Sequence, residues 1–318
     1  MEISLFEGRR YLTFKVGEKD KGKEILSIMR NDLALSARRI KSVKYCEYGI
    51  FVNGKRENVR YRLSEGDILH VLIEDVSDSC SCLVETDIRP DVIYEDEDLL
   101  VVIKPSGLVC HPSQGHYADS LINAVCTYLR EKGEKSSLHI TGRLDKDTSG
   151  LVCFSKSSYV QEKMESMRNE GSLHKKYIAL VHGILPQKEG SHISYMKEIS
   201  TEDGKHTVMT AASAEDGKKA ETFYKVLAQK NDISLVSVVI GTGRTHQIRF
   251  HMAELGHPLL GDAFYGGKMI MGMERAALHA LDLWFDHPVS GKELNFRAPV
   301  PKDMDNIIQT LSFDGFLP

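Results

Sequence analysis

Residues 141–151, Thr-Gly-Arg-Leu-Asp-Lys-Asp-Thr-Ser-Gly-Leu, form a short polar stretch between two apolar segments of the chain. Ile140 precedes the stretch and Val152-Cys153-Phe154 follow it, so we expect a loop that joins two strands. The loop holds two carboxylates, Asp145 and Asp147. Polar residues in such a loop often only cap a turn, and this is the role we expect for Asp147. A loop on a rigid scaffold can also present a reactive group, so the role of Asp145 depends on its neighbours.

The composition is that of an ordinary globular protein. The 318 residues are 42% hydrophobic and 27% charged, which suits about two domains. A net charge of −4 argues against a protein that coats nucleic acid indiscriminately, although it permits local basic surfaces. The apolar runs are strand-sized and the first residues do not resemble a signal peptide, so we expect a cytoplasmic protein, without membrane association, that acts as a monomer. The six cysteines show no C-x-x-C spacing, which favours reduced thiols over disulfides or a zinc site.

Residues 1–75 predict a small α+β domain with a basic surface. Strands are expected near residues 11–16, 50–55 and 63–73, and helices within residues 21–35 and from Ser36 onward. Between residues 35 and 63, eight Lys and Arg stand against two Glu. This charge is either an ordinary solvated surface or a footprint for RNA phosphates, for which we single out Arg38 and Arg39.

The same region resembles the small RNA-binding module shared by a ribosomal small-subunit protein, bacterial tyrosyl-tRNA synthetases and heat-shock proteins. The matching residues are Leu35-Ser36, Arg39-Ile40, Gly49, Val52-Asn53-Gly54-Lys55, Leu63 and Gly66-Asp67. The segment before Gly49 departs from the pattern, because such modules usually carry a helix end and a short loop there. The resemblance implies an N-terminal RNA-binding domain.

The rest of the chain predicts an acidic linker and a larger domain. Residues 76–90 are the expected linker, because the surrounding stretch 74–98 holds ten acidic residues against one arginine. In residues 91–318 the predicted strands outnumber the helices and are joined mostly by short turns, with an exposed hairpin expected over residues 191–217. This pattern predicts a mixed, largely antiparallel sheet with flanking helices, so the whole chain is predicted to be α+β.

A second polar cluster follows directly after the strand predicted at residues 233–240. It contains Arg244, Thr245, His246, Gln247, Arg249 and His251. Burying these groups is costly unless they pair with charge elsewhere, and Asp145 is a natural partner for an arginine. The Gly241-Thr-Gly243 piece is too short for a dinucleotide-binding fingerprint. The two histidines lack an evident third metal ligand, which favours a hydrogen-bonding role and no metal site.

These segments together resemble the RluA family of pseudouridine synthases, which isomerise uridine to pseudouridine in structured RNA. The family's H-R-L-D-x-x-T-S-G-L motif matches residues 142–151, with Gly142 in place of the histidine. Its K-x-Y-x-A-x-V-x-G strand matches residues 175–183, and its T-G-R-T-H-Q-I-R-x-H segment matches residues 242–251. Shorter matches lie at residues 104–112, 256–262 and 278–280, so that the resemblance covers about residues 91–302.

The resemblance implies a role for each matched residue. Asp145 is the expected catalytic carboxylate, Arg249 its ion-pair partner and Tyr177 the residue that faces the uracil ring, as a stacking surface or as the group that takes the C5 proton. A buried carboxylate has a raised pKa, and a nearby guanidinium lowers it again. Further contacts with the RNA substrate are expected from Arg143, Arg244, His246, Gln247 and Thr148.

The expected reaction moves the uracil from an N1 to a C5 linkage without redox change or water, so it needs neither a nucleotide cofactor nor a metal. The expected substrate is large-subunit ribosomal RNA, with transfer RNA as the alternative. Two other classes of protein are open. A non-catalytic RNA-binding protein would explain the basic module but not the set of Asp145, Tyr177 and Arg249. A hydrolase that uses Asp145 and His246 would need a pair of groups that activates water.

Overall fold

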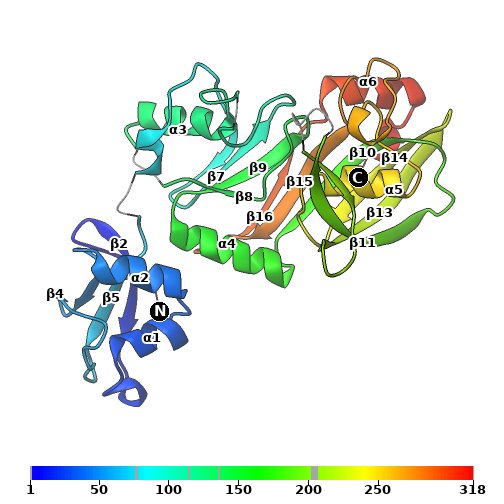
Figure 1. The fold of residues 1–318 in the computed structure, drawn as a ribbon. Coiled ribbons are helices and arrows are strands. Elements are labelled where there is room, and N and C mark those ends of the chain that lie inside the picture. Colours follow the sequence, from blue (N-terminus) through cyan, green and yellow to red (C-terminus); the bar gives the residue numbers. More distant parts are fainter. Residues whose placement is uncertain (1, 76–77, 114, 135–136, 202–206, 318) are drawn as a thin grey trace.

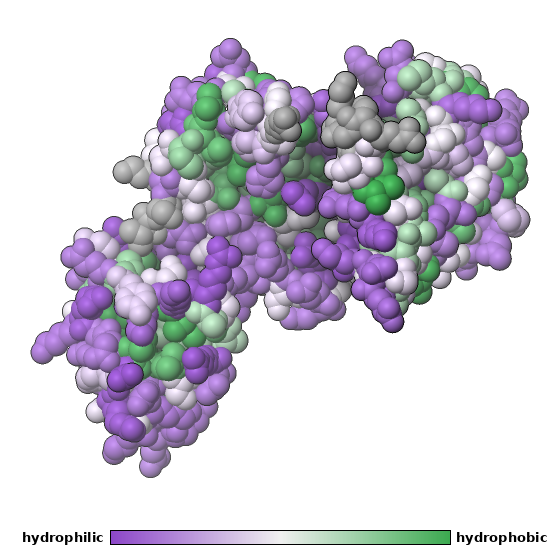
Figure 2. Space-filling view, viewed as in Figure 1, coloured by the Kyte–Doolittle hydropathy of each residue, from purple (hydrophilic) through white to green (hydrophobic). Residues whose placement is uncertain are grey.

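The computed structural model describes residues 2–75, 78–113, 115–134, 137–201 and 207–317. Two β-sheets organise them, a five-stranded sheet near the N-terminus and an 11-stranded sheet in the rest of the chain. The N-terminal module is the blue body of Figure 1 and a separate lobe in Figure 2. The predicted α+β class is therefore confirmed. Within these ranges, no helix is long and apolar enough to cross a membrane.

The N-terminal module is an antiparallel sheet, in the order β1-β2-β5-β3-β4, with two helices. Ser36 caps α2, because its hydroxyl accepts the backbone N–H of Arg39 at 3.0 Å. Asn53 and Gly54 take positive φ angles of 50° and 77°, as a tight hairpin turn requires. The elements are β1 (Glu2–Phe6), β2 (Arg9–Lys15), η1 (Glu18–Asp20), α1 (Ile25–Asn31), α2 (Ala37–Tyr45), β3 (Ile50–Val52), β4 (Lys55–Arg56) and β5 (Ile68–Leu72).

The large sheet is mixed but largely antiparallel, as predicted. Its order is β12-β11-β13-β14-β10-β15-β9-β7-β6, with β16 beside β15 and β8 beside β9. Among the strand pairs that the structure describes, only β15 and β9 are parallel. The predicted hairpin is present as β11 and β12. The strands are β6 (Asp91–Glu95), β7 (Leu99–Lys104), β8 (His139–Thr141), β9 (Ser149–Ser155), β10 (His174–His182), β11 (Glu189–Ser200), β12 (Thr207–Ala211), β13 (Lys218–Lys230), β14 (Ile233–Ile240), β15 (Leu278–Asp286) and β16 (Glu293–Arg297).

Strand β10 lies inside this sheet and sends alternate side chains into two cores. Tyr177 and Ala179 enter the core shared with α3, whereas Ile178 and Leu180 enter the core shared with α6. The first core also contains apolar residues of the central loop and of α5, so it brings the three motifs of the sequence together. The remaining elements are η2 (Ser79–Cys82), α3 (Leu121–Glu131), α4 (Ser158–Glu170), α5 (Gln247–Glu254), η3 (Ala263–Tyr265), α6 (Lys302–Leu311) and η4 (Asp314–Phe316).

Arg39 joins the N-terminal module to the large domain instead of facing solvent. It is 2% exposed, and its Nη1 donates to Asp75 and to the Ser158 hydroxyl of α4, each at 2.8 Å. Its Nη2 donates to two backbone carbonyls at the end of β5. Burial raises the pKa of Asp75, but hydrogen bonds from His139 and Ser158 and the charge of Arg39 hold it well below its usual value. The sequence predicts that Arg39 contacts RNA, whereas in the structure the side chain is buried and both of its terminal nitrogens donate to acceptors within the protein.

The junction between the two parts also has an apolar core. One cluster of buried side chains includes Tyr11 and Val71 of the N-terminal module together with Val101 and Tyr159 of the large domain. Arg10 reaches across the junction, and its two terminal nitrogens donate to the carboxylate of Asp98 at 2.8 and 3.1 Å. The N-terminal module is therefore packed against the large domain.

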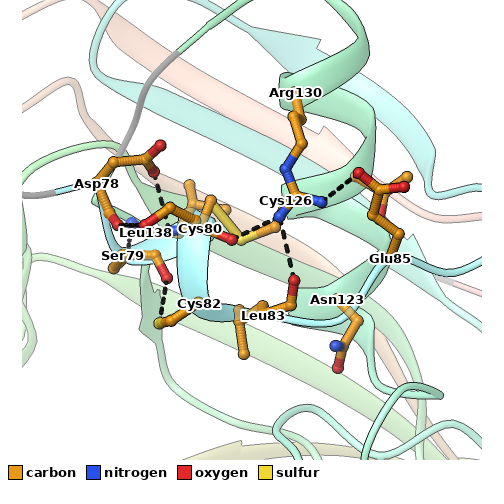
Figure 3. The surroundings of a disulfide bond; sticks show 12 residues. Asp78, Ser79, Cys80, Cys82, Leu83, Glu85, Asn123, Cys126, Arg130 and Leu138 are labelled. Carbon is orange, nitrogen blue, oxygen red and sulfur yellow. Dashed lines mark hydrogen bonds and ion pairs between the residues drawn. A yellow bond between two sulfur atoms is a disulfide. The ribbon is translucent and has the colours of Figure 1, made fainter.

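Part of the segment predicted as a linker is tied to α3 by a disulfide (Figure 3). Cys80 of η2 is bonded to Cys126, with 5.1 Å between their Cα atoms. Arg130 of α3 reinforces this contact by donating to the backbone carbonyls of Cys80 and Leu83 and to the carboxylate of Glu85. The prediction of reduced thiols is wrong for this pair. The two cysteines lie 46 residues apart, so the fold and not a sequence spacing brings them together.

Candidate active site

The central loop, residues 142–148, joins β8 to β9 and rests on a buried lysine at the end of β7. Lys104 is fully buried, and its Nζ donates to the carbonyls of Pro105, Leu108 and Lys146 at 2.9, 2.7 and 2.8 Å. Burial lowers the pKa of this ammonium group to about 8. These bonds fix the backbone directly after Asp145. The sequence offers one signal for this role, a lysine at the end of an apolar strand, which did not suffice to predict it.

The far side of the loop is held through the backbone of Asp147. Its carbonyl accepts hydrogen bonds from the Ser106 hydroxyl at 2.9 Å and from Arg275 Nη1 at 3.0 Å. Arg275 is itself held by the carboxylate of Asp303 at 2.6 and 3.0 Å. The sequence predicts that the Asp147 carboxylate caps the turn, and the contacts that the structure describes here are made by its backbone carbonyl. The loop is thus fixed on both sides of Asp145.

Asp145 approaches α5, where Arg249 lies buried between two carboxylates. Oδ2 of Asp145 lies 3.7 Å from Nη1 of Arg249, an ion pair too long for a direct hydrogen bond. The closer partner is Asp262, whose two oxygens accept hydrogen bonds from Nε and Nη2 at 2.7 and 2.8 Å. Burial lowers the pKa of Arg249, but the hydrogen bond to Asp262 and the charges of both carboxylates raise it above its usual value. Arg249 therefore stays charged.

The two carboxylates differ in their exposure. The Asp262 side chain is 0% exposed, whereas the Asp145 side chain is 23% exposed. Asp262 therefore anchors the guanidinium, and Nη1 is left to face an aspartate that a substrate can reach. Sequence reasoning did not predict Asp262 as a site residue. Its only signal is its place in the short match at residues 256–262, which does not reveal its partner.

Tyr177 faces the same core as Leu144 of the central loop and Ile248 of α5. It is 5% exposed. Burial raises the pKa of its phenol well above the usual value, and the negative charge of Asp145 raises it further. The side chain is therefore a protonated phenol at neutral pH. Lys175 Nζ lies 5.9 Å from the ring centroid.

Aromatic residues of η3 line the other side of Arg249. The guanidinium carbon lies 5.7 Å from the ring centroid of Phe264 and 5.4 Å from that of Tyr265, within range of a cation–π contact. The Tyr265 hydroxyl accepts the backbone N–H of Met209 at 2.8 Å and is hydrogen-bonded to His246 Nδ1 at 3.0 Å. Burial lowers the pKa of His246, so this imidazole is neutral. The β11–β12 hairpin is thus tied to the beginning of α5.

The other predicted substrate contacts divide by exposure. Gln247 is buried. Its amide nitrogen donates to the Glu221 carbonyl and the Thr222 hydroxyl of β13. Its amide oxygen accepts from the Thr242 hydroxyl and the Arg244 backbone N–H, just before α5. Thr148 is also buried, and its hydroxyl lacks a hydrogen-bond partner among the described residues. Exposed side chains are those of Arg38, Arg143 and Arg244. Gly142 has a φ of 75°, a left-handed conformation that glycine adopts without strain where the matched motif has histidine.

Comparisons with known proteins give consistent results. Residues 98–254 match the family model described as RNA pseudouridylate synthase. The chain is 34% identical over 280 residues to an uncharacterized RNA pseudouridine synthase, YjbO, of Bacillus subtilis, covering 87% of this chain and 96% of that one. It is 35% identical to ribosomal large subunit pseudouridine synthase D of Vibrio vulnificus, covering 80% of each. The solved structure of human RNA pseudouridylate synthase domain containing 4 has a similar fold, with a TM-score of 0.57 at 24% identity over 70% of this chain and 92% of that one.

Proposed function

Because this chain belongs to the RNA pseudouridylate synthase family and is an RNA pseudouridine synthase, we propose that it isomerises a uridine of large-subunit ribosomal RNA and that Asp145 is its catalytic carboxylate. The observation that carries the site is the ion pair of Asp145 with Arg249, which buried Asp262 holds, next to the core that contains Tyr177. The choice of RNA rests on several relatives of about this identity that are named large-subunit synthase D.

The chemistry requires one ionised carboxylate. The bond from N1 to C1′ breaks, the uracil turns, and a bond from C5 to C1′ forms; C5 loses a proton and N1 gains one, so product and substrate are isomers. Asp145 supplies the carboxylate, whether it attacks the sugar, attacks the base or removes the C2′ proton. Arg249 places its positive charge beside this carboxylate. The separation of 3.7 Å leaves the Asp145 oxygens available to the substrate.

Tyr177 supplies a ring for the flipped uracil to stack on and a hydroxyl for proton transfer. Its raised pKa excludes a pre-formed phenolate at neutral pH. The hydroxyl instead relays a proton, taking the one from C5 as it gives its own to an acceptor on the way to N1. Tyr177→Phe keeps the ring, so RNA affinity is expected to stay within about twofold while turnover falls about 10²–10⁴-fold. Normal turnover of Tyr177→Phe, measured by single-turnover assay, would leave Asp145 as the proton acceptor.

The RNA substrate is tested by mapping pseudouridines. The purified protein is incubated separately with unmodified large-subunit ribosomal RNA and with unmodified transfer RNAs, and Asp145→Asn serves as the blank. We expect new pseudouridine in the ribosomal RNA, at positions that are unmodified in a strain lacking this protein. Product in transfer RNA alone would replace the ribosomal substrate with the alternative one and leave the reaction class unchanged.

The basic surface of α2 is the proposed second contact with RNA. Arg38, Lys41 and Lys44 are exposed along this helix, whereas Arg39 is not. Each of the three is able to neutralise a phosphate, which gives affinity without sequence preference. The enzyme is proposed to act in the cytoplasm, where its RNA is found, and as a monomer, because Asp145, Tyr177 and Arg249 all come from one chain.

A further inference from the structure

Three side chains of types that can bind a metal ion lie together where strand β11 packs on helix α5. His251 and Glu254 lie three residues apart on α5, a spacing that puts both on one face of the helix. His192 comes from β11, and its Nε2 lies 3.0 Å from Oε2 of Glu254. The candidate ligand atoms of the three residues all lie within 4.8 Å of one another. No third ligand for His251 is evident from the sequence, because His192 is 59 positions away and only the fold brings it near.

Two neighbouring hydroxyl groups orient the candidate ligand atoms toward a common point. The Ser194 hydroxyl lies 3.2 Å from His251 Nε2 and 3.0 Å from Glu254 Oε2, so both atoms face the same space. The other ring nitrogen of His251, Nδ1, lies 2.8 Å from the Thr222 hydroxyl. Metal-ligating histidines typically have such a partner on the nitrogen opposite the metal, because it fixes the ring and the tautomer.

Burial and access also suit a cation. His251 is 0% exposed, so its ring is held in place beside the other two candidate ligands. The side chains of His192 and Glu254 are each 25% exposed, which gives an ion a route from solvent. Among the described residues, Asp96, Asp98 and His287 form a second cluster of this kind, but Arg10 already occupies Asp98 with two hydrogen bonds.

We propose that His192, His251 and Glu254 bind a borderline divalent metal ion, with Zn²⁺ as the best fit to two imidazoles and one carboxylate, and that the ion pins the β11–β12 hairpin to α5. Zn²⁺ commonly takes three such protein ligands at about 2.0–2.2 Å and one water. The ion takes no part in the isomerisation.

The proposed metal site matters because both elements that form it, β11 and α5, also pack near the candidate catalytic residues. Helix α5 carries Arg249 two residues before His251. The hairpin packs on the same helix through a small apolar cluster that includes Met196, Met209 and Phe250. A bond from β11 to α5 through a metal therefore reinforces the contacts that Ser194 makes with α5 and that Tyr265 makes with Met209. Zinc is expected to stabilise the hairpin over the site.

The test measures zinc binding to the full-length, chelator-treated protein by calorimetry, with Mg²⁺ as the ion that should not bind. We expect one Zn²⁺ per chain, and Co²⁺ in its place should give the absorption of a tetrahedral site. His192→Gln and Glu254→Gln should each weaken Zn²⁺ affinity about tenfold or more. The matched control is His116→Gln, which also removes an exposed imidazole beside a carboxylate, Asp119 at 2.6 Å, but one whose other nitrogen faces Lys146.

A second measurement separates metal binding from folding. Zn²⁺ should raise the melting temperature of the wild type and slow amide exchange in β11 and β12, because a ligand that binds the folded state stabilises it. The same ion should leave His192→Gln unchanged, while the metal-free melting temperatures of both proteins stay equal. Absent binding to the wild type, or Zn²⁺ affinity that is unchanged in both His192→Gln and Glu254→Gln, would overturn the proposal. Loss of turnover in Asp145→Asn bears on the isomerase site and not on this one.

Discussion

Arg249 and Arg39 are both buried arginines paired with aspartates, but they serve different ends. Arg39, at the junction of the two domains, is 2% exposed and makes four hydrogen bonds to fixed protein acceptors. Arg249 is 3% exposed and is held on one edge by Asp262, while its Nη1 faces Asp145 at 3.7 Å. Asp145 is partly exposed, and the acceptors of Arg39 belong to packed backbone and to Asp75 and Ser158.

The difference separates an arginine that holds the fold together from one that we propose acts in catalysis. Where all acceptors are fixed, the charge only stabilises the fold. Where one nitrogen faces a carboxylate that a substrate can reach, the same charge acts on chemistry. Position in a basic stretch of sequence does not distinguish the two cases. The comparison therefore predicts that substitutions at these arginines divide between loss of turnover and loss of stability.

The largest effect is expected for Arg249→Ala. It leaves Asp262 charged and fully buried without its partner, at a cost of about 3–5 kcal/mol in unfolding free energy. Turnover of the protein that remains folded should fall about 10²–10³-fold, since Asp145 loses its nearby positive charge. Arg249→Lys, which lacks the planar fork, should recover only part of both losses. Urea unfolding and single-turnover assays measure the two effects, and wild-type turnover in Arg249→Ala would refute the assignment.

Arg39→Ala should lose stability without losing chemistry. The charged hydrogen bond to Asp75 is removed, which costs about 1.5–3 kcal/mol, although Ser158 still donates to this carboxylate. Turnover on a short stem-loop, assayed well below the melting temperature, should stay within about twofold of the wild type. If turnover fell by more than about tenfold while stability held, Arg39 would belong with Arg249 and the comparison would fail.

The smallest effect is expected for Arg38→Ala, the exposed neighbour of Arg39. Stability should change by less than about 0.5 kcal/mol, as for most surface positions. If Arg38 contacts a phosphate, the slope of log affinity against log salt should decrease by about 0.7–0.9. Lys19→Ala is the matched control, because Lys19 is an exposed cation of the same module outside the basic stretch. Equal slopes for both variants and the wild type would remove Arg38 from the RNA surface.

The sequence predicted the sheet, and it also indicated the three segments of the candidate active site, because each is a local pattern. Strand periodicity and the motifs around Asp145, Tyr177 and Arg249 can each be recognised within a window of about ten residues. What it did not predict depends on contacts between distant elements. Lys104 holds the carbonyl of Lys146, 42 residues away, and Arg39 binds Asp75, 36 residues away. Composition and spacing carry no signal for such pairs, because the packing of strands and helices decides which charges meet.

The same limit explains the corrected expectations. Arg39 belongs to a basic stretch, and only the position of α2 against α4 shows that it is buried. The pairing of Cys80 with Cys126 depends on η2 lying against α3. Asp262 was quoted within a motif, but its partnership with Arg249 follows from the way η3 folds back beside α5.

We propose that the Asp145 carboxylate performs the chemistry, and a matched pair of substitutions decides whether it does. Asp145→Asn and Asp147→Asn each remove one charge from the same loop and leave its length and backbone unchanged. Asp147 supports the loop through its carbonyl, so its variant should turn over at about the wild-type rate. Asp145→Asn should fold and bind RNA but form no pseudouridine. Turnover by Asp145→Asn within about tenfold of the wild type, with product confirmed by mapping, would show that Asp145 is not the catalytic carboxylate.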